Sequence, residues 1–172
     1  MSPEQTQKTM TLGNTLAAEL RYESISTRKM LERITTEILD WQPHTKSAKL
    51  GYLAQHIARL PSFVKPVLTM DEFDLATAQR PAPATSAAEL VESFDQLLAE
   101  ATEYLNNASD EDLSVAWKLR SGDHTIFEMP RAGVIRTLVL SHLIHHRGQL
   151  SVYMRLNDVP VPSIYGPSAD EQ

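Results

Sequence analysis

Three histidines in this chain have the spacing that a reactive metal site requires. His142 and His146 lie four residues apart in the run HLIHHRGQ, which begins at His142, and His56 lies far upstream. Side chains four residues apart share a helix face, so both imidazoles of the pair can reach one point. A third histidine from a neighbouring helix would complete a three-nitrogen site with an open coordination position. Catalytic metals have that pattern, whereas structural sites are closed by four protein ligands.

The apolar residues around these histidines predict that all three face the protein interior. At about 100° per residue, the pair shares a helix stripe with Ile135, Val139, Gln149 and Tyr153. The apolar neighbours of His56 on its own helix face are Tyr52, Leu53, Leu60 and Phe63. Burying three imidazoles without partners is costly, which favours a metal. The alternative at each position is a core histidine satisfied by ordinary hydrogen bonds.

The other histidines and the arginines of the last helix are expected on the solvent side. His44 lies in a loop, His124 in a predicted hairpin, and His145 beside the stripe of the pair. The arginines placed on the far side of this helix are Arg136, Arg147 and Arg155. The chain contains neither a His-Glu-x-x-His motif nor a Glu-x-x-His pair, which argues against a zincin-type protease and a ferritin-like di-iron bundle.

Composition narrows the class of protein. A length of 172 residues is typical of one domain, here residues 1–172, and the net charge of −6 argues against a nucleic-acid or anionic-membrane partner. The chain has no cysteine, which excludes disulfides, cysteine-ligated zinc and a cysteine nucleophile. Met1 to Met10 lacks the apolar core of a signal peptide, and no apolar run approaches the roughly 20 residues that span a bilayer. We therefore expect a cytoplasmic protein without membrane partners.

Periodicity predicts an all-α four-helix bundle. The four predicted helices cover about 5–39, 49–69, 86 onward and 130–157. Pro61 and Pro66 should kink or shorten the second helix, and Ser86 with Glu89 fits a capping box at the start of the third.

Two connections complete this predicted architecture. The first, residues 71–85, is long enough to cross the length of the bundle. The second is predicted to form a short β-hairpin, with strands at residues 115–119 and 125–127 around Ser121-Gly122-Asp123. The hairpin falls between the third and fourth helices. The predicted fold is a four-helix bundle with at least one long crossover.

Four segments together resemble the DinB/YfiT-like proteins. They are DWQP from Asp40, LGYLAQHIA from Leu50, HxxxHRGQL from His142 and GPSADE from Gly166. The resemblance covers nearly the whole chain and implies an up-up-down-down bundle with a three-histidine site for a divalent metal, most often zinc or nickel. The three ligand positions of that pattern fall on His56, His142 and His146. Characterised relatives include thiol-dependent S-transferases and a mycothiol-dependent maleylpyruvate isomerase.

The resemblance therefore implies a chemistry without identifying a substrate. A metal with an open position can hold a low-molecular-weight thiol as thiolate for attack on an electrophile, and the absence of cysteine fits a nucleophile that arrives with its cofactor. Water activated by the metal would instead make a hydrolase. A non-catalytic metal-binding protein is the third alternative.

Two further residues are candidates for roles near the metal. Glu23, an acid on an apolar stripe, is the candidate base; the alternative is a buried carboxylate bonded to a histidine, Arg21 or Arg28. Arg59, one turn after His56, is a candidate for binding an anionic group, with a surface ion pair as the alternative.

Two expectations concern surfaces. The tail from Val159 to Gln172 is expected to fold back toward the open end of the metal site and bring Tyr165 to the substrate, or else to be disordered. Leu140, Leu143 and Ile144 lie opposite the histidines and predict a homodimer interface, unless another part of the chain covers them.

Overall fold

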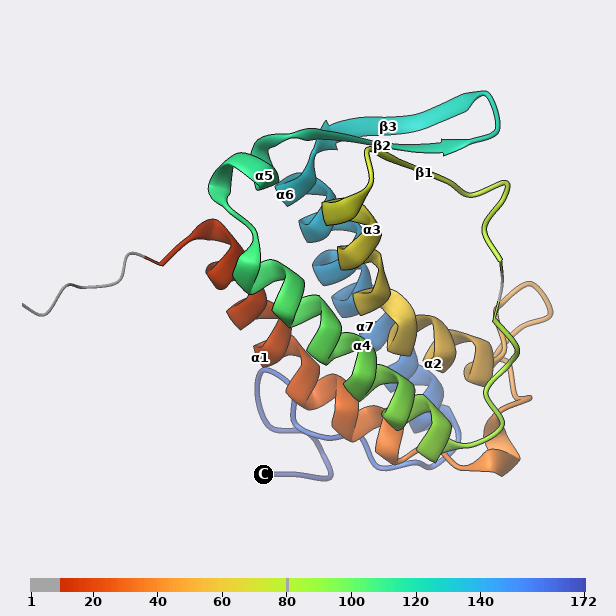
Figure 1. The fold of residues 1–172 in the computed structure, drawn as a ribbon. Helices are drawn as coiled ribbons and strands as arrows, with labels where there is room; N and C mark the ends of the chain where they lie inside the picture. Colours follow the sequence, from red (N-terminus) through yellow and green to blue (C-terminus); the bar gives the residue numbers. More distant parts are fainter. Residues whose placement is uncertain (1–9, 80) are drawn as a thin grey trace, which may run out of the picture.

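Helices make up most of the computed structural model, which describes residues 10–79 and 81–172 (Figure 1). One hydrophobic core joins side chains from Leu16 to Val159. The α-helices are α1 (Leu12–Glu32), α2 (Leu50–Arg59), α3 (Val64–Thr69), α4 (Ala87–Asn107), α5 (Asp110–Ser114), α6 (Arg131–Val134) and α7 (His142–Leu156). The strands are β1 (Glu72–Asp74), β2 (Ala116–Ser121) and β3 (His124–Pro130). Two 3₁₀ turns, η1 (Thr36–Ile38) and η2 (Leu60–Phe63), and one π-helical segment, η3 (Ile135–Ser141), complete the elements.

Helix α1 ends earlier than predicted. It begins at Leu12, where the Thr11 side chain accepts a hydrogen bond from the backbone N–H of Asn14, and it ends at Glu32. The predicted start at residue 5 lies outside the described residues. Beyond the end of α1, the carbonyls of Leu39 and Trp41 accept from the N–H groups of Gly51 and Leu50, the first residues of α2, which have no partner within their own helix.

The contact between these two segments explains why residue 51 is a glycine. A Cβ atom at Gly51 would lie 3.0 Å from the Leu39 carbonyl oxygen and 3.2 Å from the Leu39 Cβ. The close approach of the two segments therefore needs a residue without a side chain.

The second predicted helix is confirmed as a kinked unit. Pro61 lies in η2, which separates α2 from α3.

The predicted capping box of α4 is only half formed. The Ser86 hydroxyl accepts from the N–H of Glu89 at 3.2 Å, but the Glu89 carboxylate accepts from the N–H of Thr85 instead of returning to Ser86. A complete capping box lies at the start of α5, between Ser109 and Asp112. This short helix was not predicted.

A three-stranded sheet lies at one end of the helices and has one strand more than the predicted hairpin (Figure 1). The predicted hairpin is confirmed as the antiparallel pair β2–β3, with Gly122 in the left-handed conformation at φ 57°. Strand β1 comes from the predicted crossover and pairs parallel with β2, which the sequence did not reveal. Arg120 of β2 holds it through ion pairs of 2.7 Å with Glu72 and with Asp74. Trp117 of β2 is fully buried in the core.

The last predicted helix is interrupted by η3, directly before His142. A π turn closes i→i+5 hydrogen bonds, so residues before His142 do not keep the 100° phase with residues after it. Within α7 the core-facing stripe is buried and consists of Leu143, Arg147, Leu150 and Met154. The histidine stripe is its half-buried neighbour, not the core face that we predicted.

Two predictions therefore fail on this helix. Arg147 is 1% exposed rather than on the solvent side. Leu140 and Leu143 belong to the hydrophobic core of the chain, so they cannot form the predicted dimer surface. The homodimer, the single domain and the up-up-down-down order stay predictions. None of the helices between residues 10 and 172 combines the length and apolarity that a membrane crossing needs.

Candidate metal centre

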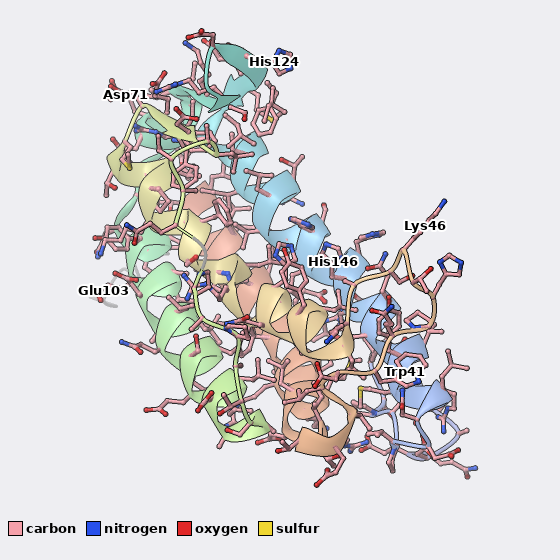
Figure 2. The ribbon with its side chains drawn as sticks, turned by 90° about the vertical axis from the view of Figure 1, so that its right-hand side faces the viewer. Trp41, Lys46, Asp71, Glu103, His124 and His146 are labelled. Atoms are coloured by element: carbon pink, nitrogen blue, oxygen red, sulfur yellow. The ribbon has the colours of Figure 1, made fainter. Side chains whose placement is uncertain are left out.

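The three predicted ligands meet at one point between two helices. His56 comes from α2, and His142 and His146 come from successive turns of α7, against which α2 packs. The His142 Nε2 atom lies 3.2 Å from that of His56 and 2.8 Å from that of His146. Each residue is half-buried, and the three candidate ligand atoms lie within 4.8 Å of one another. Figure 2 shows His146 beside the loop that carries Trp41 and Lys46.

A hydrogen bond on the far side of the His146 ring determines which of its nitrogens carries the proton. His146 Nδ1 lies 2.7 Å from the Gln149 amide oxygen, which can only accept, so Nδ1 carries hydrogen. A neutral imidazole with hydrogen on Nδ1 has its lone pair on Nε2. His146 therefore directs its Nε2 lone pair at the Nε2 atom of His142, 2.8 Å away.

This arrangement fits a cation between the rings. A cation between the rings would bind the Nε2 lone pair of His146 and those that neutral His56 and His142 can also offer. A proton is not favoured there: burial, and then the charges of His142 and His146, lower the pKa of His56 to about 4, and burial also lowers the pKa of His142. Nitrogens bound tetrahedrally to one zinc ion at about 2.0–2.1 Å lie about 3.3–3.4 Å apart, so the rings need to open only slightly.

An open cavity of about 300 Å³ adjoins the histidines. Two aromatic residues of its lining contact other rings. The Tyr52 ring lies parallel to the His56 ring, and the Trp41 ring packs edge-on against the Tyr153 ring with 5.4 Å between their centroids. The lining residues are Ser47, Ala48, Tyr52, Leu53, His56, His146, Gln149 and Tyr153. This lining holds no carboxylate, lysine or arginine. The cavity therefore offers ring faces, hydroxyls and one amide to a bound molecule.

Glu23 is buried with partners other than those expected. Its carboxylate accepts from Arg147 Nη2 at 2.6 Å and from the Tyr165 hydroxyl at 2.7 Å. Among the described residues it makes no hydrogen bond to a histidine, Arg21 or Arg28; Arg28 pairs with Asp95 and Glu32 instead.

The tail folds back, but not to the histidines. Tyr165 and Glu23 line a separate cavity of about 210 Å³ on the α1 side, and this cavity shares no lining residue with the histidine cavity. The tail is held there by Arg33 with Glu171 and by Arg155 with Asp170. The expectation that the tail approaches the open end of the metal site is therefore corrected.

The remaining histidines and Arg59 lie outside the site. His44 and His124 are exposed, as expected. Arg59 is half-buried at the end of α2, is not part of the cavity lining, and forms no ion pair within the described part of the chain. Sequence analysis gave no role to Gln149 beyond its place on the stripe, although its position three residues after His146 on a helix indicates contact.

The chain is thus a mostly helical protein in which three histidines form a candidate metal centre beside an open cavity. The chain belongs to the DinB family, whose model matches residues 5–172. It is 29% identical over 158 residues to the uncharacterized protein YrdA of Bacillus subtilis (strain 168), covering 87% of this chain and 86% of the relative.

Solved structures agree with this assignment. A DinB-like protein from Bacillus cereus ATCC 10987 superimposes with a TM-score of 0.68 at 26% identity, covering 91% of this chain and 99% of that one. The DinB-like protein YjoA from Bacillus subtilis has the same TM-score at 16% identity, covering 92% and 100%, and so supports the fold alone.

Proposed function

We propose that His56, His142 and His146 bind a divalent metal ion, zinc or nickel, and that the protein transfers a low-molecular-weight thiol to an electrophile. The observation that carries the metal is the convergence of three Nε2 atoms, with the Nδ1 of His146 already engaged as a donor. Imidazole nitrogen is a common ligand of both metals. When bound, such a metal supplies positive charge that lowers the pKa of a thiol and favours thiolate.

The cavity lining favours thiol transfer over hydrolysis. Hydrolysis needs a base near the activated water, and the expected base, Glu23, is paired with Arg147 and lines a different cavity. The thiol releases its proton to solvent when it binds, so the thiolate then attacks without a base. Tyr52, Leu53 and Tyr153 would contact the apolar part of the electrophile, while the Ser47 hydroxyl and the Gln149 amide can hydrogen-bond to its polar atoms.

The metal assignment is tested by elemental analysis of the untagged protein. Alanine at His56, His142 or His146 should sharply lower the metal content, whereas alanine at His44 or His124 should leave it unchanged. Full metal content in His142→Ala would refute the assignment.

The chemistry is tested on cobalt-substituted protein. Addition of a thiol should produce a thiolate-to-cobalt absorption band, and a generic electrophile should then be consumed together with the thiol. If no thiol changes the spectrum while esters or amides are turned over, the protein is a hydrolase. Metal binding without either reaction identifies a non-catalytic metal-binding protein.

A further inference from the structure

Gln149 connects two histidines through the two ends of its amide. Its Oε1 accepts from His146 Nδ1 at 2.7 Å, and its Nε2 donates to His145 Nε2 at 3.1 Å. His145 and His146 are adjacent in α7 and Gln149 follows one turn later, where it also lines the cavity beside the metal site. The residue is exposed, so the fold does not need it for core packing.

The direction of this amide matters for the nitrogen that faces the metal. With the oxygen toward His146, the ring carries hydrogen on Nδ1 and keeps the Nε2 lone pair for a metal. With the amide reversed, its NH₂ group would donate to Nδ1, the hydrogen of His146 would lie on Nε2, and this nitrogen could not bind a metal. When His145 carries its hydrogen on Nδ1, its Nε2 accepts from the NH₂ end of the amide and favours the first orientation.

We propose that Gln149 is a positioning residue of the metal site, which holds His146 as the Nδ1–H tautomer, and that His145 fixes the orientation of the Gln149 amide. This inference rests on the proposed metal site. Loss of such an outer hydrogen bond typically weakens metal binding by about 10–100-fold.

The test is zinc affinity, measured by competition with a chromophoric chelator. Gln149→Met keeps the length of the side chain but has no acceptor for Nδ1–H, so its zinc dissociation constant should rise by about 10–100-fold. Gln149→Glu keeps the acceptor and should stay within a few-fold of wild type. His145→Ala should cause a smaller loss, and combining it with Gln149→Met should add little. Val152→Met, at an exposed position of the same helix, is the matched control and should change nothing.

A second measurement does not need the metal. Imidazole ¹⁵N chemical shifts of the metal-free protein report which nitrogen of His146 is protonated. We expect one tautomer in the wild type and in Gln149→Glu, and a mixture in Gln149→Met. An unchanged melting temperature of the metal-free variants would exclude a general effect on folding.

The outcomes separate this inference from the proposed function. Tight zinc binding by the wild type with equal affinity in Gln149→Met, or an unchanged tautomer in that variant, would overturn the role of Gln149 while the metal site stands. Absence of zinc binding by the wild type would overturn both.

Discussion

Replacing Arg147 by Met should destabilise the protein strongly. Arg147 is only 1% exposed. Its guanidinium donates hydrogen bonds to Glu23, Ser26, Thr27 and Tyr165. Glu23 is also buried, at 7% exposure. Without the guanidinium, its carboxylate keeps only the Tyr165 hydroxyl as a side-chain partner. Removing one partner of a buried ion pair typically costs about 3–5 kcal/mol, because the other charge is left uncompensated. We expect a loss of that size in the free energy of unfolding.

The matched variants decide whether the pair itself is responsible. Glu23→Leu should cost a similar amount, because it leaves Arg147 buried without a carboxylate. The double variant Glu23→Leu/Arg147→Met should be more stable than the two single losses added together, with a coupling of about 2–3 kcal/mol. Tyr165→Phe removes one hydrogen bond from the carboxylate and one from the guanidinium and should cost about 1–2 kcal/mol.

Urea unfolding of the metal-free protein, followed by circular dichroism, measures these differences as shifts of the midpoint at constant slope. A loss below about 1 kcal/mol for Arg147→Met would contradict the reasoning. Strict additivity in the double variant would do the same, since it would mean that the two side chains do not interact.

Three further predictions concern acidity, the tail and association. Because the pKa of His56 is lowered from 6.5 to about 4 in the folded state, the unfolded chain binds a proton first as the pH falls. The metal-free protein should therefore lose about 1–2 kcal/mol between pH 6.5 and pH 4, after allowance for the half-exposed ring, and His56→Gln should remove this part of the dependence in urea titrations. Truncation after Pro162 should lower the melting temperature but leave zinc affinity unchanged, because the two cavities share no residue; weaker zinc binding would show that the tail does reach the metal site. Light scattering should give twice the chain mass of 19.3 kDa if the homodimer forms; Leu143→Glu should unfold the chain rather than dissociate a dimer, and a folded Leu143→Glu monomer would contradict its burial.

The sequence by itself determined the candidate metal site. Helical spacing brings His142 and His146 to one face whatever surrounds them, and the apolar stripe of His56 marks a second helix that must pack inward. The hairpin was predictable for a similar reason, since Gly122 supplies the left-handed turn residue between two short strand patterns. These features depend on residues that are close in sequence.

Tertiary structure decided which stripe of α7 faces the core. The stripe with Leu143 and Leu150 contains Arg147. A charged residue predicts a solvent-facing stripe unless a buried partner neutralises its charge. Its partners are Glu23 from α1 and Tyr165 from the tail, distant in sequence from Arg147 and from each other. Periodicity cannot show such a pairing, because it reads only the neighbours within one helix. The same limit hid β1, whose three residues form a strand only because β2 offers them hydrogen-bond partners.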